Sequence, residues 1–317
     1  MRAKKISGLL IAVALCLILS SLITVGVGAR GAIDTERPVS MTLTYSYDGH
    51  AFEGLEICIY RVAEVSRSCV FALKGDFESY PVLVNDVKTQ TEWRQIASTL
   101  AGYVTADGLK PTATGSTDGN GNVTFDGLET GLYLVLGCTV DYERGYCTFD
   151  SYMLSLPTIS EEDAKESWVY DVTARPKSVL AEPGPEDIEY TVNKLWKDSG
   201  FEHRRPASVE FGLYKNGELV KDVVLSSEND WTYSWTAPDD GSIWQVVEKN
   251  VPDKYSVTIE RKGNTFIAAN AYGDENPPPV TGDTVDINLY VIVMCIAGVL
   301  LLILGIALNR GKRNEKR

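Results

Sequence analysis

The chain alternates apolar and polar residues in short runs separated by Gly and Asp, which predicts β-strands joined by tight turns. The first run places Val39, Met41, Leu43, Tyr45 and Tyr47 on one face and stops at 48–49, an Asp-Gly hairpin dipeptide. Further strands are expected at 55–63, 122–126, 131–137 and 151–156.

One helix is expected within this first series of strands. A Thr89/Glu92 capping box precedes the helical pattern, and Gly108 follows it. The apolar residues that recur at helical spacing are Trp93, Ile96, Ala97, Leu100, Tyr103 and Val104.

A second series of strands runs from Ile188 to Tyr272, with turn dipeptides at 216–217 and 262–263. About seven short strands in about 90 residues are typical of an immunoglobulin-like sandwich. We therefore predict an all-β chain of two tandem immunoglobulin-like β-sandwiches. The first, 30–177, carries the inserted helix, and a linker at 178–187 containing Pro183-Gly184-Pro185 joins it to the second, 188–273.

Both ends of the chain carry export features. Residues 1–29 combine a basic start with an apolar stretch and small residues, which predicts a signal peptide. A Pro-rich stalk at 274–287 leads to an uncharged apolar segment, 288–308, long enough for a transmembrane helix, and to a basic cytoplasmic tail at 309–317. This order excludes a cytosolic enzyme and a multi-span transporter.

The net charge is −13, and the exported section is more acidic still, because both ends of the chain are basic. A surface of that sign repels nucleic acid, so no nucleic-acid partner is expected. With only two histidines and no nucleophile elbow, phosphate loop or metal-ligand spacing, we expect no enzyme, no cofactor and no metal site.

Four of the six cysteines, Cys58, Cys69, Cys138 and Cys147, lie in the first half of the exported section. An even number outside the cell indicates two disulfides, with three possible pairings. Cys138 and Cys147 flank a hairpin tip, so we pair them first, which leaves Cys58 with Cys69. A reactive Cys–Gln thioester at Cys147 is the less favoured alternative.

Three polar residues fall on apolar rows of the second sandwich. The row 188, 190, 192, 194, 196 includes Lys194, the row 244, 246, 248 includes Glu248, and the row 266, 268, 270, 272 includes Asn270. One interpretation is a buried Lys194–Glu248 ion pair beside Asn270. The other is covalent: a desolvated, neutral Lys194 attacks the Asn270 amide while a protonated Glu248 moves the proton, which leaves an isopeptide bond.

Several segments resemble the collagen-adhesin B-type (Cna B) domain of Gram-positive surface proteins: 191–198 (TVNKLWKD), 205–209 (RPASV), 231–233 (WTY) and 248–255 (EKNVPDKY). The resemblance covers roughly 188–273. It implies that Lys194 and Asn270 form an autocatalytic isopeptide bond with Glu248 as the catalytic residue, and it favours the covalent interpretation. The first half lacks a lysine on its first apolar row, so no such bond is expected there.

The stalk contains Pro278-Pro279-Val280-Thr281-Gly282, which resembles the LPXTG sorting motif, with Pro278 where Leu is usual. The resemblance implies that a sortase cleaves between Thr281 and Gly282 and passes the threonine to an amine. A basic tail after an apolar span, as here, is the usual context of that motif.

Residues 168–177 (WVYDVTARPK) resemble the pilin motif of sortase-assembled pili, whose lysine accepts the threonine of another subunit. That lysine corresponds to Lys177, which follows the outward row of the strand; the alternative is an ordinary solvated lysine.

The resemblances together imply a structural subunit of a sortase-assembled, covalently linked pilus, anchored to the cell wall at the surface of a Gram-positive cell. The implied partners are a sortase, other pilin subunits and peptidoglycan, with any host ligand unknown. The alternative is a wall-anchored adhesin, or a basal or tip pilin that does not polymerise through its own lysine.

Overall fold

The computed structural model describes residues 31–160, 167–184 and 186–273. All of them belong to one compact unit. The expected signal peptide, the sorting motif 278–282 and the expected transmembrane segment lie outside these ranges. Within the described ranges, no helix combines the length and the apolar character that a membrane span requires.

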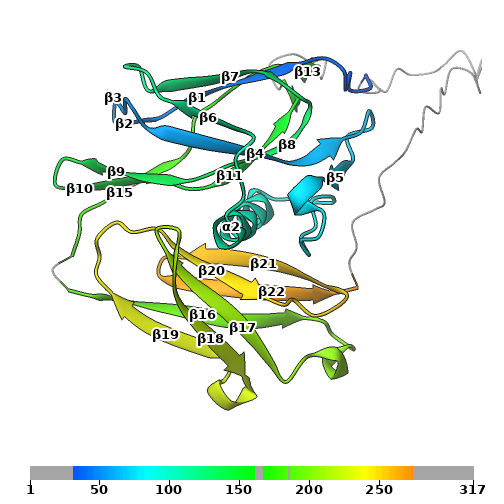
Figure 1. Cartoon of the computed structure of the whole chain (residues 1–317), viewed down its shortest axis with the longest axis vertical. Helices are drawn as coiled ribbons and strands as arrows, with labels where there is room; N and C mark the ends of the chain where they lie inside the picture. Colours follow the sequence, from blue (N-terminus) through cyan, green and yellow to red (C-terminus); the bar gives the residue numbers. More distant parts are fainter. Residues whose placement is uncertain (1–30, 161–166, 185, 274–317) are drawn as a thin grey trace, which may run out of the picture. The chain divides into compact units, whose positions relative to one another are not determined.

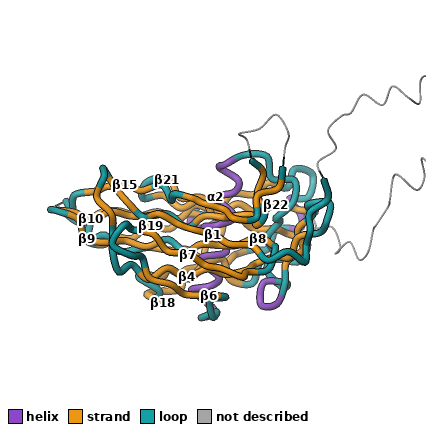
Figure 2. The backbone as a smooth tube through the Cα atoms, turned by 90° about the horizontal axis from the view of Figure 1, so that it is seen from above, coloured by secondary structure: helices purple, strands orange, loops and turns teal. Residues whose placement is uncertain are grey.

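The described chain consists mostly of strands, with one long helix among them (Figure 2). The elements of the amino-terminal half are β1 Val39–Thr44, β2 Ser46–Tyr47, β3 His50–Ala51, β4 Glu56–Val65, β5 Phe71–Leu73, a 3₁₀ turn Gly75–Phe77, α2 Gln90–Asp107, β6 Ala113–Ser116, β7 Asn122–Leu128, β8 Gly131–Val135, β9 Cys138–Tyr142, β10 Gly145–Phe149, β11 Tyr152–Leu156, β12 Thr158–Ile159, β13 Trp168–Val169, β14 Asp171–Ala174 and β15 Ser178–Ala181.

The amino-terminal half is built from several small sheets. Their strand orders are β14-β1-β7, β15-β10-β9 and β11-β8-β4-β5, with β6 also paired to β4. The strand β1 shows the expected alternation, since Val39, Met41 and Leu43 are all buried. These side chains belong to a core that also contains Tyr133 and Phe149.

The strand β15 lies in the segment 178–187, which was expected to be linker. It pairs antiparallel with β10 and places Leu180 opposite Cys147. Alternation over four residues is too short a pattern to separate this edge strand from a linker. The amino-terminal half therefore extends to Ala181, beyond the boundary expected from the sequence.

The helix α2 begins with the expected capping box. The Thr89 side chain accepts from Glu92 N, and the Glu92 carboxylate accepts from Thr89 N. It ends at Gly108, whose left-handed backbone (φ 60°) suits a residue without a Cβ.

The carboxy-terminal half is a two-sheet sandwich (Figure 1). One sheet has the order β19-β16-β22-β21 and the other β18-β17-β20, and β16 runs parallel to β22. Its elements are β16 Ile188–Lys197, a 3₁₀ turn Glu202–Arg204, β17 Ser208–Lys215, β18 Glu218–Ser226, a 3₁₀ turn Ser227–Asn229, β19 Thr232–Ala237, β20 Trp244–Lys249, β21 Tyr255–Lys262 and β22 Thr265–Tyr272.

The helix α2 packs against strands of both halves. Leu132 and Leu134 of β8 belong to the same apolar cluster as Leu100 of α2 and Val247 of β20. Their neighbours Tyr133 and Val135 face the other core, so both faces of β8 are buried. One continuous cluster therefore runs from the sheet around β8, through α2, into the carboxy-terminal sandwich. Figure 1 shows α2 between these two sets of strands.

Candidate functional site

The three polar residues expected on apolar rows meet inside the carboxy-terminal sandwich. Lys194 on β16 and Asn270 on β22 lie on neighbouring strands of one sheet, where Lys194 is opposite Ala268 and Asn270 opposite Trp196. Glu248 comes from β20 in the facing sheet. The side chains of Lys194 and Glu248 have no exposed area, and Asn270 is also fully buried.

The Glu248 carboxylate links the other two side chains. Lys194 Nζ lies 3.0 Å from Oε2 and donates to it, and Asn270 Nδ2 donates to Oε1 over 2.8 Å. The carbonyl oxygen of Asn270 is buried without a hydrogen-bond partner. An amide rotated by half a turn presents that oxygen to Glu248, and the contact becomes a hydrogen bond when Glu248 carries a proton.

Burial shifts both ionisable groups toward their neutral forms. Burial lowers the pKa of Lys194 to about 8, although Glu248 opposes the shift. Burial raises the pKa of Glu248, with Lys194 opposing it. A neutral amine is a nucleophile and a protonated carboxyl can donate a proton, so burial shifts both groups toward the forms that attack on the Asn270 amide requires.

An aromatic and charged shell surrounds Lys194. Its Nζ lies 4.3 Å from the centre of the Trp196 ring, which contacts Trp231 and Tyr255 edge-on. Asp198, whose side chain is also unexposed, accepts from Arg205 over 2.6 and 2.9 Å and from the Tyr255 hydroxyl over 2.9 Å. This network is not among the features expected from the sequence, although Asp198 and Arg205 both lie within the segments that resemble the Cna B domain.

We expect Asp198→Asn to destabilise the chain at pH 7 by about 1–3 kcal/mol, the cost of weakening hydrogen bonds to a charged group. The hydrogen bonds from Arg205 lower the pKa of Asp198. This contribution is present above the unfolded-state pKa of about 4 and is lost as the pH falls below it. Urea unfolding at pH 7 and at pH 3 measures the difference.

The exposed Asp253→Asn is the matched control for that measurement. We expect it to leave the unfolding free energy unchanged at both pH values. A penalty for Asp198→Asn that is as large at pH 3 as at pH 7 would contradict the ionic origin of its contribution.

Neither of the two disulfides expected from the sequence is formed among the described residues. Cys138 and Cys147 are not joined to each other. The β9–β10 register places Cys138 opposite Phe149 and Cys147 opposite Val140, so the two cysteines are diagonal neighbours. Diagonal Cα atoms lie about 7–8 Å apart, which is beyond the span of a disulfide.

Cys58 and Cys69 are not joined either. Cys58 lies near the start of β4, where its sulfur contacts the Thr114 hydroxyl at 3.6 Å, and Cys69 follows the far end of that strand. The rise along an extended strand separates them by about 20 Å. The spacing of the cysteines along the chain carries no information on the length of β4, which sets the distance between them.

Lys177 is exposed and lies between β14 and β15. In the segment before it, Tyr170 and Val172 are buried and Asp171 and Thr173 are exposed, so Lys177 follows the outward row as expected. The Thr281 with which it would react lies outside the described residues.

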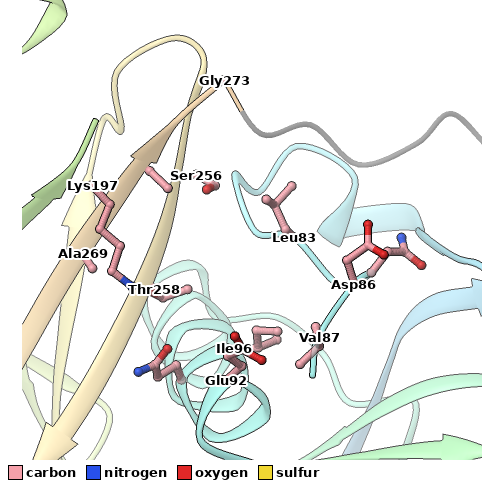
Figure 3. Close-up of a pocket in the computed structure, with 13 residues that line it drawn as sticks. Leu83, Asp86, Val87, Glu92, Ile96, Lys197, Ser256, Thr258, Ala269 and Gly273 are labelled. Carbon is pink, nitrogen blue, oxygen red and sulfur yellow. The ribbon is translucent and has the colours of Figure 1, made fainter. Parts of the chain in front are cut away.

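A cavity of about 450 Å³ lies beside α2 (Figure 3). Leu83, Asp86 and Glu92 line it from the amino-terminal half, and Lys197, Thr258 and Ala269 from the other half. Asp86 and Glu92 are the two carboxylates that line this cavity, and two carboxylates are fewer than a metal site usually has. The described residues contain no group of three or more His, Cys, Asp or Glu placed to hold an ion.

Residues 190–271, which include Lys194, Glu248 and Asn270, match the family model of the Cna protein B-type domain. The collagen adhesin of Staphylococcus aureus is 26% identical over 129 residues, which cover 38% of this chain and 11% of the adhesin. The chain thus aligns with a small part of that protein.

Two solved structures match this chain at low similarity. A single B repeat unit (B1) of the Staphylococcus aureus collagen-binding surface protein is 14% identical, with 75% of this chain and 100% of that chain covered and a TM-score of 0.27. The full-length major pilin SpaD from Corynebacterium diphtheriae is also 14% identical, with 78% and 100% covered and a TM-score of 0.27. Scores this low carry no conclusion about function.

Proposed function

We propose that this chain is a non-enzymatic structural subunit of a covalently assembled, sortase-dependent pilus on a Gram-positive cell surface, stabilised by a Lys194–Asn270 isopeptide bond. The observation that carries the proposal is the buried Lys194–Glu248–Asn270 contact within the residues that match the Cna protein B-type domain. A cross-link inside one sandwich suits a fibre subunit that bears tension.

The isopeptide bond forms when Lys194 attacks the side-chain amide of Asn270 and ammonia leaves. The lone pair of neutral Lys194 Nζ attacks Cγ of Asn270, and the new Nζ–Cγ bond replaces the Cγ–Nδ2 bond. Glu248 donates its proton toward the Asn270 amide and takes a proton from Nζ, so it ends unchanged and the leaving group departs as ammonia. The reaction needs no cofactor, since both reactants and the proton carrier belong to the chain.

Assembly of the polymer uses a different lysine. The ε-amine of exposed Lys177 would accept the Thr281 acyl group of another subunit, which a sortase thiolate has released from Gly282. The last subunit would pass its threonine to an amine of peptidoglycan. Exposure supports this role for Lys177, as full burial supports the internal role for Lys194.

The test of polymerisation is an immunoblot of cell-wall extracts in sodium dodecyl sulfate. The wild-type chain, expressed with its sortase, is expected as a ladder of detergent-resistant species. A single wall-linked band would contradict polymerisation and would favour the alternative, a wall-anchored adhesin or a basal or tip subunit. The similarity to a collagen adhesin is the observation behind that alternative.

A further inference from the structure

The outward-facing rows of the carboxy-terminal sandwich are buried where they face α2. Val246 and Glu248 of β20 point into the sandwich, and Val247 between them points outward, yet Val247 is only 4% exposed. Gly102 of α2 covers it so closely that a Cβ at position 102 would lie 2.9 Å from Val247 Cγ2. The helix thus contacts the strand that carries Glu248, at the residue beside it.

The strand β21 lies at the edge of its sheet, and its outer N–H groups form hydrogen bonds with the amino-terminal half. The N–H of Ile259 donates to Thr99 Oγ1 of α2 over 2.7 Å, and the N–H of Val257 donates to Pro81 O over 2.8 Å. Val257 lies opposite Asn270 in the sheet. The helix therefore holds the strand that flanks Asn270 as well as the strand that carries Glu248.

A third contact reaches Glu248 itself. The buried hydroxyl of Tyr103 donates to the Glu248 carbonyl oxygen over 3.4 Å. Burial raises the pKa of this hydroxyl, with Glu248 the next largest cause, so it remains a donor. The Tyr103 ring stacks on Tyr80 with 4.4 Å between centroids, which fixes its position.

The contact between α2 and the sandwich is closed over Val247, beside Glu248, and open over Thr258 and Ala269 of the neighbouring sheet. The cavity is lined by Glu92, Gln95 and Ile96 from the early turns of α2 (Figure 3). The later residues Thr99, Gly102 and Tyr103 are buried and make the contacts to β20 and β21 described above. The sealed part of α2 therefore coincides with the level of Glu248.

We propose that α2 of the amino-terminal half is a positioning element for the isopeptide reaction in the carboxy-terminal half. Thr99, Gly102 and Tyr103 hold β20 and β21, which lie in opposite sheets, at the spacing that brings Glu248 against Lys194 and Asn270. Cross-linking then depends on docking of the two halves. This inference rests on the proposed isopeptide bond and extends it.

The test follows the rate at which Lys194 becomes joined to Asn270 in the full chain. After a pulse of synthesis, protease digestion and mass spectrometry measure the linked fraction over time. Gly102→Leu introduces a better helix former than glycine but collides with Val247, so we expect cross-linking about tenfold slower or more. Arg94→Leu, on the exposed face of the same helix, is the matched control and should react at the wild-type rate.

A milder pair of variants applies if Gly102→Leu does not fold. Thr99→Val conserves shape but leaves the Ile259 N–H without its acceptor, so we expect the reaction to slow by about fivefold or more. Thr99→Ser keeps the hydroxyl and should restore the rate. Circular dichroism before the time course establishes that each variant is folded.

The measured rates separate the positioning role of α2 from the existence of the isopeptide bond. Wild-type rates in Gly102→Leu and Thr99→Val, with a cross-linked wild type, would overturn the role of α2 and leave the proposed function intact. A wild type without the cross-link would contradict the isopeptide proposal itself. Slow reaction in folded Thr99→Val together with recovery in Thr99→Ser supports the positioning role, because loss of packing alone does not depend on a hydroxyl.

Discussion

Replacement of Glu248 by Gln is expected to abolish the cross-link and to lower the melting temperature by about 10 °C. Gln cannot carry the proton from Lys194 Nζ to the Asn270 amide, so the chain keeps its full sequence mass. Covalent closure of a loop of roughly 75 residues is worth about 4 kcal/mol by the chain-entropy argument used for disulfides. In a unit of this size, each kcal/mol corresponds to about 2–4 °C.

The control for Glu248→Gln is Glu189→Gln, an exposed site on the strand that carries Lys194. It makes the same chemical change outside the buried site, and we expect wild-type mass and melting temperature. Intact mass spectrometry and calorimetry measure both quantities. A cross-link that forms at the normal rate in Glu248→Gln would show that this carboxyl is not the proton carrier.

Replacement of Lys177 by Arg is expected to remove the detergent-resistant ladder completely. A guanidinium keeps the positive charge but stays protonated, so it cannot attack the acyl group that the sortase holds. The structure places Lys177 at the surface, so the change should cost little stability. Immunoblots of wall extracts that contain the active sortase measure the loss.

The equally exposed Lys110→Arg is the control for polymerisation and should leave the ladder unchanged. Persistence of the ladder in Lys177→Arg would assign the acceptor amine to another lysine. Loss of the ladder in both variants would point to an effect on expression or export instead of on the acceptor.

The sequence predicted the second half well because its strands are long. Ten residues in β16 give a clear alternation, which placed Lys194 on the buried row with Tyr190 and Val192. The alternation of β20 and β22 identified Glu248 and Asn270 in the same way, and all three side chains are buried together. The helix was equally clear, since its capping box and apolar spacing are local signals.

Other features depend on contacts between segments distant in the sequence, and alternation does not contain them. The four-residue strand β15 is too short to be told from a linker by its alternation, and the spacing of Cys138 and Cys147 does not contain the β9–β10 register. The burial of Val247 on an outward row, and the hydrogen bond from Ile259 to Thr99, arise only because α2 packs across β20 and β21. At Val247 and Ile259, packing against α2 therefore overrides what the local sequence pattern predicts.

Stability alone does not separate a covalent bond from a buried ion pair, since loss of either partner of such a pair also costs several kcal/mol. The mass of the wild-type chain does separate them. After protease digestion, the account predicts one branched peptide that joins Lys194 to Asn270 and is lighter by one ammonia than its two parts. Recovery of the two peptides separately, each at its sequence mass, would contradict it.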